Sequence, residues 1–186
     1  CFCYIWRWDG SLMSDFEEIE QITLSSDAAS ISFTSIPQTY KTLQVSCQLR
    51  ADSTSFPYGT RAHVRINGDT DSSNYNQFGQ YIIRTGTSSA TQDKSKHNQF
   101  MIVGAASNSD ANLMGYTRLT FNNYSAAFQK TGYYQMTAFK DLNNNGQYSD
   151  TGLWNWMNAS AITSLTFTGA ATLLSGSSIS IYGMKG

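Results

Sequence analysis

Alternation of apolar and polar residues with a period of two is the dominant pattern of this chain. It is clearest over residues 41–51, where Leu43, Val45, Cys47 and Leu49 alternate with polar side chains. Successive side chains of a β-strand point to opposite faces of the sheet, so this segment predicts a strand with one buried and one solvated face. In that register we expect Cys47 to be a small apolar residue of the core rather than a reactive thiol.

Further short segments share this pattern, and turn-forming residues separate them. Asn67-Gly68 is a strong signal for a tight hairpin turn, since both central residues of such a turn need positive φ. The remaining expected strands are residues 18–24, 30–36, 60–67, 80–85, 100–105, 116–121, 128–139, 161–168 and 177–184. Strands at this spacing predict an all-β protein. We expect a jelly-roll-like antiparallel β-sandwich, formed by a single domain over residues 16–186.

The last third of the chain carries an aromatic segment, Leu153-Trp154-Asn155-Trp156-Met157, ahead of its two final predicted strands. We expect Trp154 and Trp156 to cap the apolar face of those strands as part of the core. Polar connections between strands are predicted at residues 86–97, 107–112 and 140–150.

Composition narrows the classes of function. Charged residues make up 13% of the 186-residue chain, and the net charge is −1. This net charge does not indicate the excess of basic residues that binding to nucleic acid or to an anionic membrane surface requires. No apolar run approaches the ~20 residues that span a bilayer. We therefore expect neither a nucleic-acid nor a membrane partner. Three cysteines, Cys1, Cys3 and Cys47, leave their pairing undecided.

Residues 1–15 form an N-terminal arm ahead of the predicted domain, and this arm is rich in aromatic side chains. Its candidate partner-binding residues are Tyr4, Ile5, Trp6 and Trp8. One interpretation is an anchoring arm that buries this apolar set on a partner. The other is an edge strand that folds back on the domain, or a segment that lies outside the natural start of the chain.

A partial calcium-loop pattern follows the predicted strand over residues 128–139. Asp141, Asn143 and Asn145 supply oxygen ligands at alternate positions, and a glycine comes next, as in the first half of an EF-hand loop. The closing carboxylate is missing, because Gly152 occupies its position, and Asp150 replaces it only on a different backbone path. The same residues are typical of a hairpin loop. We treat the segment as a weak calcium candidate and expect no cofactor.

Sequence patterns of catalysis are poorly represented. The two histidines, His63 and His97, are both expected at the surface. The chain contains no Gly-x-Ser-x-Gly segment that would place a nucleophilic serine. We therefore expect a protein without enzymatic activity.

Several stretches resemble a known group of proteins. They are ITLSSDAASISFTSIPQTYKTLQVSCQLRAD (residues 22–52), RINGDTDSSNY (residues 65–75) and the ending WMNASAITSLTFTG…GSSISIYGMKG. These stretches are similar to a family of small virion proteins from tailed phages of marine and freshwater bacteria, cyanophages among them. The resemblance covers nearly all of the chain from Met13 onward and includes no catalytic motif. It implies a capsid decoration (cement) protein, a tail-fibre protein or another virion structural protein, and no cofactor.

Composition and resemblance together lead us to expect a non-enzymatic capsid decoration protein on the outer surface of a virion, bound to the major capsid protein. A homotrimer around a symmetry axis of the shell is the expected assembly, with the aromatic arm and exposed strand edges as contacts. The alternative is a tail-fibre tip that recognises host-surface glycans through the connections at residues 86–97 and 107–112. A third hypothesis is a calcium-stabilised carbohydrate-binding module.

Overall fold

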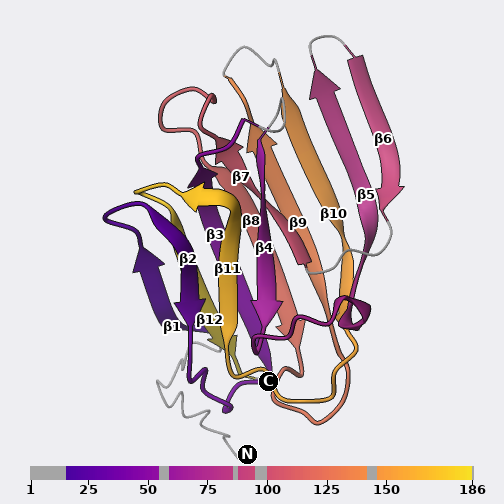
Figure 1. Cartoon of the computed structure of the whole chain (residues 1–186). Helices are drawn as coiled ribbons and strands as arrows, with labels where there is room; N and C mark the ends of the chain where they lie inside the picture. Colours follow the sequence, from indigo (N-terminus) through magenta and orange to yellow (C-terminus); the bar gives the residue numbers. More distant parts are fainter. Residues whose placement is uncertain (1–15, 55–58, 86–87, 95–99, 142–145, 186) are drawn as a thin grey trace, which may run out of the picture.

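The computed structural model describes residues 16–54, 59–85, 88–94, 100–141 and 146–185, and these consist mainly of β-strands (Figure 1). The elements are β1 (Phe16–Thr23), β2 (Ala28–Phe33), β3 (Thr42–Ala51), β4 (Thr60–Ile66), the 3-10 turn η1 (Ser72–Asn74), β5 (Tyr75–Thr85), β6 (Ser88–Lys94), β7 (Phe100–Ala106), β8 (Gly115–Asn122), β9 (Lys130–Phe139), β10 (Gln147–Trp156), β11 (Leu165–Leu173) and β12 (Ser178–Met184). The prediction of an all-β protein is confirmed.

Two sheets of antiparallel neighbours make up a jelly-roll-like sandwich, as predicted. Sheet A has the strand order β1-β12-β3-β8-β9-β10-β5-β6, and sheet B has the order β2-β11-β4-β7. The sheets join at the ends of β3, β7 and β11, where Ala51 pairs with both Ala106 and Leu173. Figure 1 shows β5 and β6 along one side of the molecule and β1 and β2 along the opposite side. The outer face of sheet A, which points away from sheet B, is therefore broad.

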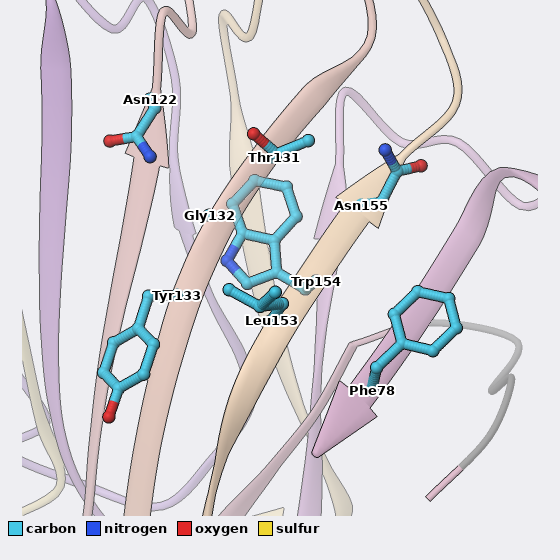
Figure 2. A pocket seen from close by; sticks show the side chains of 8 residues that line it. All are labelled: Phe78, Asn122, Thr131, Gly132, Tyr133, Leu153, Trp154 and Asn155. Atoms are coloured by element: carbon cyan, nitrogen blue, oxygen red, sulfur yellow. The ribbon is translucent and has the colours of Figure 1, made fainter.

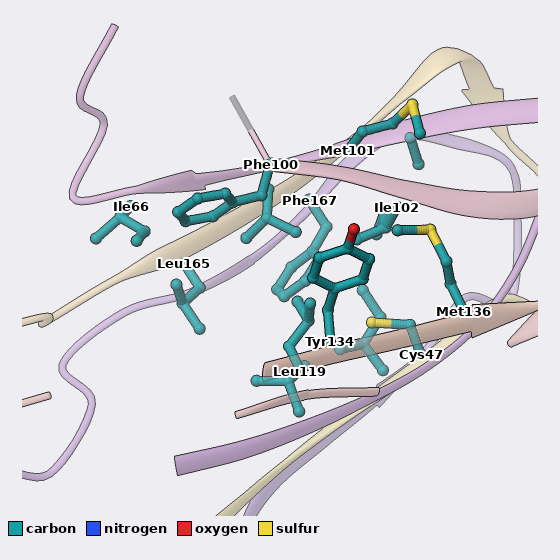
Figure 3. Close-up of a cluster of buried hydrophobic side chains, with 14 of the residues drawn as sticks. Cys47, Ile66, Phe100, Met101, Ile102, Leu119, Tyr134, Met136, Leu165 and Phe167 are labelled. Carbon is teal, nitrogen blue, oxygen red and sulfur yellow. The ribbon is translucent and has the colours of Figure 1, made fainter. Parts of the chain in front are cut away.

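The hydrophobic core lies between the two sheets and collects the inward-facing side chains of both. Figure 3 shows residues of β3, β8 and β9 facing residues of β4, β7 and β11. The predicted inward set of β3 is fully buried, namely Leu43, Val45, Cys47 and Leu49. Burial of one such aliphatic side chain contributes about 1.5–3 kcal/mol. Cys47 is a buried free cysteine, in agreement with its expected role in the core.

Trp154 and Trp156 also lie in the core, as predicted, but they belong to a strand that the sequence did not predict. The ring centroid of Trp154 lies 4.7 Å from that of Phe100 and 4.6 Å from that of Phe121. Nε1 of Trp156 donates a hydrogen bond of 2.8 Å to Oδ2 of Asp69. This bond ties the end of β10 to the connection between β4 and β5.

Two of the three predicted polar connections contain strands. The prediction of a connection over residues 140–150 is wrong from Gln147 onward, where β10 begins. The prediction for residues 86–97 is wrong over β6, which pairs with β5 at the edge of sheet A. The two errors have different causes. β6 lies at the edge of sheet A, where backbone pairing with β5 holds a strand without apolar alternation. β10 lies inside the sheet between β9 and β5, but the first half of the strand buries the carboxylate of Asp150, which breaks the apolar pattern. The third connection, at residues 107–112, joins β7 to β8 as predicted.

The predicted turn at Asn67-Gly68 is confirmed, with φ values of 50° and 68°, but it does not close a hairpin, because β4 pairs with β7 and β11 whereas β5 pairs with β6 and β10. The side chain of Asn67 also fixes the segment that precedes β11. Its amide donates to the carbonyl of Ala161 at 2.7 Å, and its Oδ1 accepts from the backbone N–H of Thr163 at 2.9 Å. These residues hydrogen-bond to a side chain rather than to a ladder, so β11 begins at Leu165 and not at Ala161.

Candidate functional site

Part of the sequence-derived candidate set lies outside the described residues. These candidates are Tyr4, Ile5, Trp6, Trp8, Asn143 and Asn145. The partner-binding role of the N-terminal arm therefore stays a prediction, as does the contribution of the two asparagines to a calcium site.

The two carboxylates of the calcium candidate lie in different settings. Asp141 is half-buried and follows β9 closely, whereas Asp150 is buried within β10. The Asp150 carboxylate accepts hydrogen bonds from the hydroxyl groups of Tyr134 at 3.0 Å and Tyr148 at 2.7 Å. Burial, and next the charge of Asp150, raises the pKa of Tyr134, so this hydroxyl stays protonated and donates. Asp150 is therefore an acceptor inside the strand. Over the described ranges no group of three or more His, Cys, Asp or Glu side chains is placed to hold a metal ion.

The connection at residues 107–112, a candidate glycan contact, is held in place by Arg50 of β3. The guanidinium group donates hydrogen bonds of 2.8–3.2 Å to four backbone carbonyl oxygens between residues 107 and 113. Hydrogen bonds from a charged donor are among the stronger ones in proteins. This connection is therefore a fixed part of the fold.

A different surface, the outer face of sheet A, brings together side chains that the sequence places far apart. The strand register aligns these side chains in rows that cross the sheet. One row contains Asn76, Asn155, Thr131 and Asn122, and the next contains Phe78, Leu153 and Tyr133. Directly opposed side chains have Cβ atoms about 4.5–5.5 Å apart, so the members of each row are in reach of one another.

The second row is an exposed apolar patch over β5, β10 and β9. Leu153 pairs with Phe78 on one side and with Tyr133 on the other. The side chains are 61%, 50% and 44% exposed, respectively. Single exposed apolar residues are ordinary on protein surfaces, whereas a contiguous patch marks an interaction site.

A groove runs beside this row, and we call it the outer-face groove. It encloses about 390 Å³ and is lined by Phe78, Asn122, Thr131, Gly132, Tyr133, Leu153, Trp154 and Asn155 (Figure 2). Gly132 lies at the base of the groove, where the absence of a side chain lets the indole of Trp154 approach the backbone of β9. A Cβ on Gly132 would lie 1.8 Å from the carbonyl oxygen of Thr120 and 2.4 Å from Cζ2 of Trp154. The indole of Trp154 instead lies against the backbone of β9.

Tyr133 is fixed in this groove by its neighbours on both sides. Its hydroxyl group shares a hydrogen bond with the hydroxyl of Thr151 on β10. Its backbone N–H donates to Oγ1 of Thr120 on β8 at 2.9 Å. The aromatic ring is therefore held in one orientation before any partner arrives, which lowers the entropy cost of binding.

Two buried polar atoms belong to residues that line the groove. Nε1 of Trp154 and Oδ1 of Asn155 have no hydrogen-bond partner within the described part of the chain. Buried polar atoms in folded proteins almost always have a partner, so each exception calls for an explanation. Of the two residues, Asn155 lies on the outer face beside Leu153, and Trp154 faces the core.

The groove is suited to binding rather than to acid–base or nucleophilic chemistry. Its lining residues include aromatic, aliphatic, amide and hydroxyl side chains, and no carboxylate, imidazole, amine or thiol. None of these lining residues is among the candidates derived from the sequence. One signal was present: when Trp154 and Trp156 face the core, a period of two places Leu153 and Asn155 on the outer face.

Comparisons with known proteins supply no family for the chain. No protein-family model matches it, and a search of curated proteins found no match. Throughout the residues that the structure describes, no helix is long and apolar enough to span a bilayer. The groove and its surroundings are therefore the main basis for assigning a function.

Proposed function

We propose that the protein is a non-enzymatic structural protein of a phage virion surface and that it binds its partner through the outer face of sheet A. The observation that carries this proposal is the exposed apolar row of Phe78, Leu153 and Tyr133 beside the outer-face groove. A contiguous apolar patch that faces water is expected where a partner covers it. The virion context comes from the resemblance of residues 22–52 and 65–75 to small virion proteins.

Within this class, the groove supports a receptor-binding tip that recognises host-surface glycans. Concave sites with an apolar lining and a few polar groups are typical of small ligands, such as a single sugar ring. Tyr133 and Phe78 offer aromatic surface to the C–H face of a sugar. Asn122 and Asn155 offer amide groups to its hydroxyls. The contact surface is then the sheet face, and not the connections that the sequence suggested.

Capsid decoration is the second candidate, and exposed residues beyond the groove favour it. Ile82 of β5 is 52% exposed and Phe139 of β9 is 41% exposed, and both point to the outer face. They add apolar side chains to the same sheet face, beyond the polar row of Gln80, Thr151 and Gln135. Protein–protein interfaces are enriched in aromatic residues such as Phe139. In this role the major capsid protein would cover the patch, and the homotrimer would place three such patches around a symmetry axis of the shell.

Co-sedimentation separates the two roles. The purified protein is mixed with host cells and, separately, with capsids that lack a decoration protein. We expect binding to cells, and we expect Leu153→Asp to reduce it on the order of tenfold, because the charge must be desolvated against the apolar row. Leu153 is 61% exposed, so this variant keeps its fold. Thr137→Asp is the matched control, since it introduces the same charge on the outer face of β9 away from the groove.

The opposite pattern of binding would identify decoration. Sedimentation with capsids at a fixed number per shell, and not with cells, would replace the receptor-binding role with the decoration role. Binding to neither particle, or equal binding of wild type and Leu153→Asp, would refute the proposal that the apolar row is the contact surface.

A further inference from the structure

We propose that the outer-face groove binds a neutral sugar ring of a glycan chain, and that Asn155 selects the ligand by accepting a hydrogen bond from one of its hydroxyl groups. This assignment rests on the proposed receptor-binding role. It adds the chemical class of the sugar and the residue that recognises it.

The charge of the surface around the groove indicates an uncharged ligand. The strand register aligns four outward positions on each of β3, β8, β9 and β10. Their residues are Thr42, Gln44, Ser46, Gln48, Tyr116, Arg118, Thr120, Asn122, Thr131, Tyr133, Gln135, Thr137, Ser149, Thr151, Leu153 and Asn155. Arg118 is the one charged residue of this set, and its Nε donates to the hydroxyl of Tyr116 at 3.1 Å. The outward residues of β5, which also lines the groove, are Asn76, Phe78, Gln80, Ile82 and Arg84, and Arg84 lies three outward positions away from Phe78. An acidic glycan is attracted by several basic groups, whereas hydroxyl and amide side chains match a neutral one.

The aromatic and aliphatic groups of the groove match the apolar face of a sugar. A sugar ring presents C–H groups on its faces and hydroxyl groups around its edge. Tyr133 and Phe78 lie on the two strands that flank β10, with Leu153 between them, as Figure 2 shows. A ring that lies over Leu153 meets apolar surface below and an aromatic side chain at each end.

Asn155 lies at the position where the edge of such a ring needs a polar partner. It is the next outward residue after Leu153 on β10, and its register neighbours are Thr131 on β9 and Asn76 on β5. Its Oδ1 is buried and has no partner among the described residues. A turn of the side-chain amide towards the groove brings this oxygen within reach of a ligand hydroxyl group, which donates to it, and an analogue that lacks this hydroxyl leaves the acceptor unpaired. Asn155 is therefore the residue that determines specificity.

Isothermal titration calorimetry tests this assignment with the wild-type protein and two variants. The neutral probes are hexasaccharides of glucose, galactose and mannose, and the acidic probe is a hexasaccharide of galacturonic acid. We expect at least one neutral probe to bind and the acidic probe not to bind. Asn155→Leu keeps the size of the side chain and removes its polar atoms, so we expect it to weaken binding roughly tenfold. Gln48→Leu makes a comparable change three strands away on β3 and is expected to bind as the wild type does.

A cell-binding experiment distinguishes failure of this assignment from failure of the proposed function. Co-sedimentation is repeated with cells whose vicinal diols have been cleaved by periodate. If the protein binds cells equally well before and after periodate, the sugar assignment is wrong while the receptor-binding role stands. If the protein does not bind untreated cells, the proposed function is wrong. A preference for the acidic probe, no binding to any of the four probes, or unchanged affinity of Asn155→Leu would each overturn the assignment.

Discussion

Replacing Gly132 with alanine tests the packing at the base of the outer-face groove. Gly132 lies in β9, between the backbone of β8 and the indole of Trp154. A Cβ at this position would lie 1.8 Å from the carbonyl oxygen of Thr120 and 2.4 Å from Cζ2 of Trp154. The carbonyl belongs to a strand backbone, and the indole packs on Phe100 and Phe121. Neither group can move aside without a shift in a close-packed core.

The expected cost follows from this crowding. Overpacking a filled core costs about 1–3 kcal/mol, and contact with backbone belongs at the upper end of that range or above it. We therefore expect Gly132→Ala to lower the free energy of unfolding by about 3 kcal/mol or more. Gly68→Ala is the matched control, because a Cβ there would meet nothing within 4 Å, and only its φ of 68° is unfavourable. That conformation costs about 1–2 kcal/mol. Alanine also lowers the conformational entropy of the unfolded chain, which stabilises the folded state by about 0.4–1 kcal/mol. The net decrease in the free energy of unfolding is then about 1 kcal/mol.

Urea denaturation followed by tryptophan fluorescence measures both losses, and thermal unfolding gives a second measure. A chain of this length changes its Tm by about 2–4 °C per kcal/mol, so we expect decreases of roughly 6–12 °C for Gly132→Ala and about 2–4 °C for Gly68→Ala. Equal losses in the two variants would show that crowding at Gly132 adds nothing, and would refute the close packing of Trp154 against β9.

Other features of the fold give predictions that separate measurements can check. Arg50→Lys keeps the positive charge but replaces the planar guanidinium group, so most of its hydrogen bonds to the carbonyls of residues 107–113 are lost. We expect the free energy of unfolding to fall by roughly 2 kcal/mol and the amides of residues 107–113 to exchange faster with solvent. Unchanged hydrogen exchange would contradict the role of Arg50. Burial raises the pKa of Tyr75 to about 12, above its unfolded value of about 10. The folded state then holds this proton more tightly, so stability is present below pH 10 and is lost as the pH rises towards 12. Urea denaturation between pH 10 and pH 12 should show a smaller loss of unfolding free energy for Tyr75→Phe than for the wild type. Equal losses in the two proteins would contradict the raised pKa of Tyr75. Burial also raises the pKa of the Cys47 thiol, so peptide mapping after iodoacetamide treatment should find this residue unlabelled in the native protein and labelled in urea.

The part of the fold that depends on local pattern could be predicted from the sequence. An inward-facing strand such as β3 must place its apolar residues at alternate positions, and its predicted residues 41–51 agree closely with the observed Thr42–Ala51. The two tryptophans of β10 were predicted in the core because large aromatic residues dominate burial. The strand around them was missed because its first half, from Gln147, buries a carboxylate against two tyrosines. Hydrogen bonds from those hydroxyl groups help to offset the burial of Asp150, and pattern alone does not reveal them.

The outer-face groove could not be predicted, because it depends on strand pairing. Phe78, Tyr133 and Leu153 come from three separate parts of the chain and meet only through the registers of β5, β9 and β10. Each residue by itself reads as an ordinary exposed side chain. The lack of space for a side chain at Gly132 likewise depends on another strand, because the carbonyl oxygen of Thr120 on β8 lies beside it. The alternation in β10 predicts that Leu153 lies on the outer face of the sheet. Which residues of the neighbouring strands lie next to Leu153 depends on the pairing register.

Chemical-shift mapping of the bound protein tests most directly the central claim that the outer-face groove is the binding site. Nitrogen-15-labelled protein is titrated with the neutral hexasaccharide that binds most tightly. We predict that the backbone amide signals of Phe78, Tyr133, Leu153 and Asn155 move with increasing ligand, while those of β2 in sheet B stay fixed. Shifts confined to sheet B, or to residues 107–113, would contradict the account and would place the binding site elsewhere on the protein.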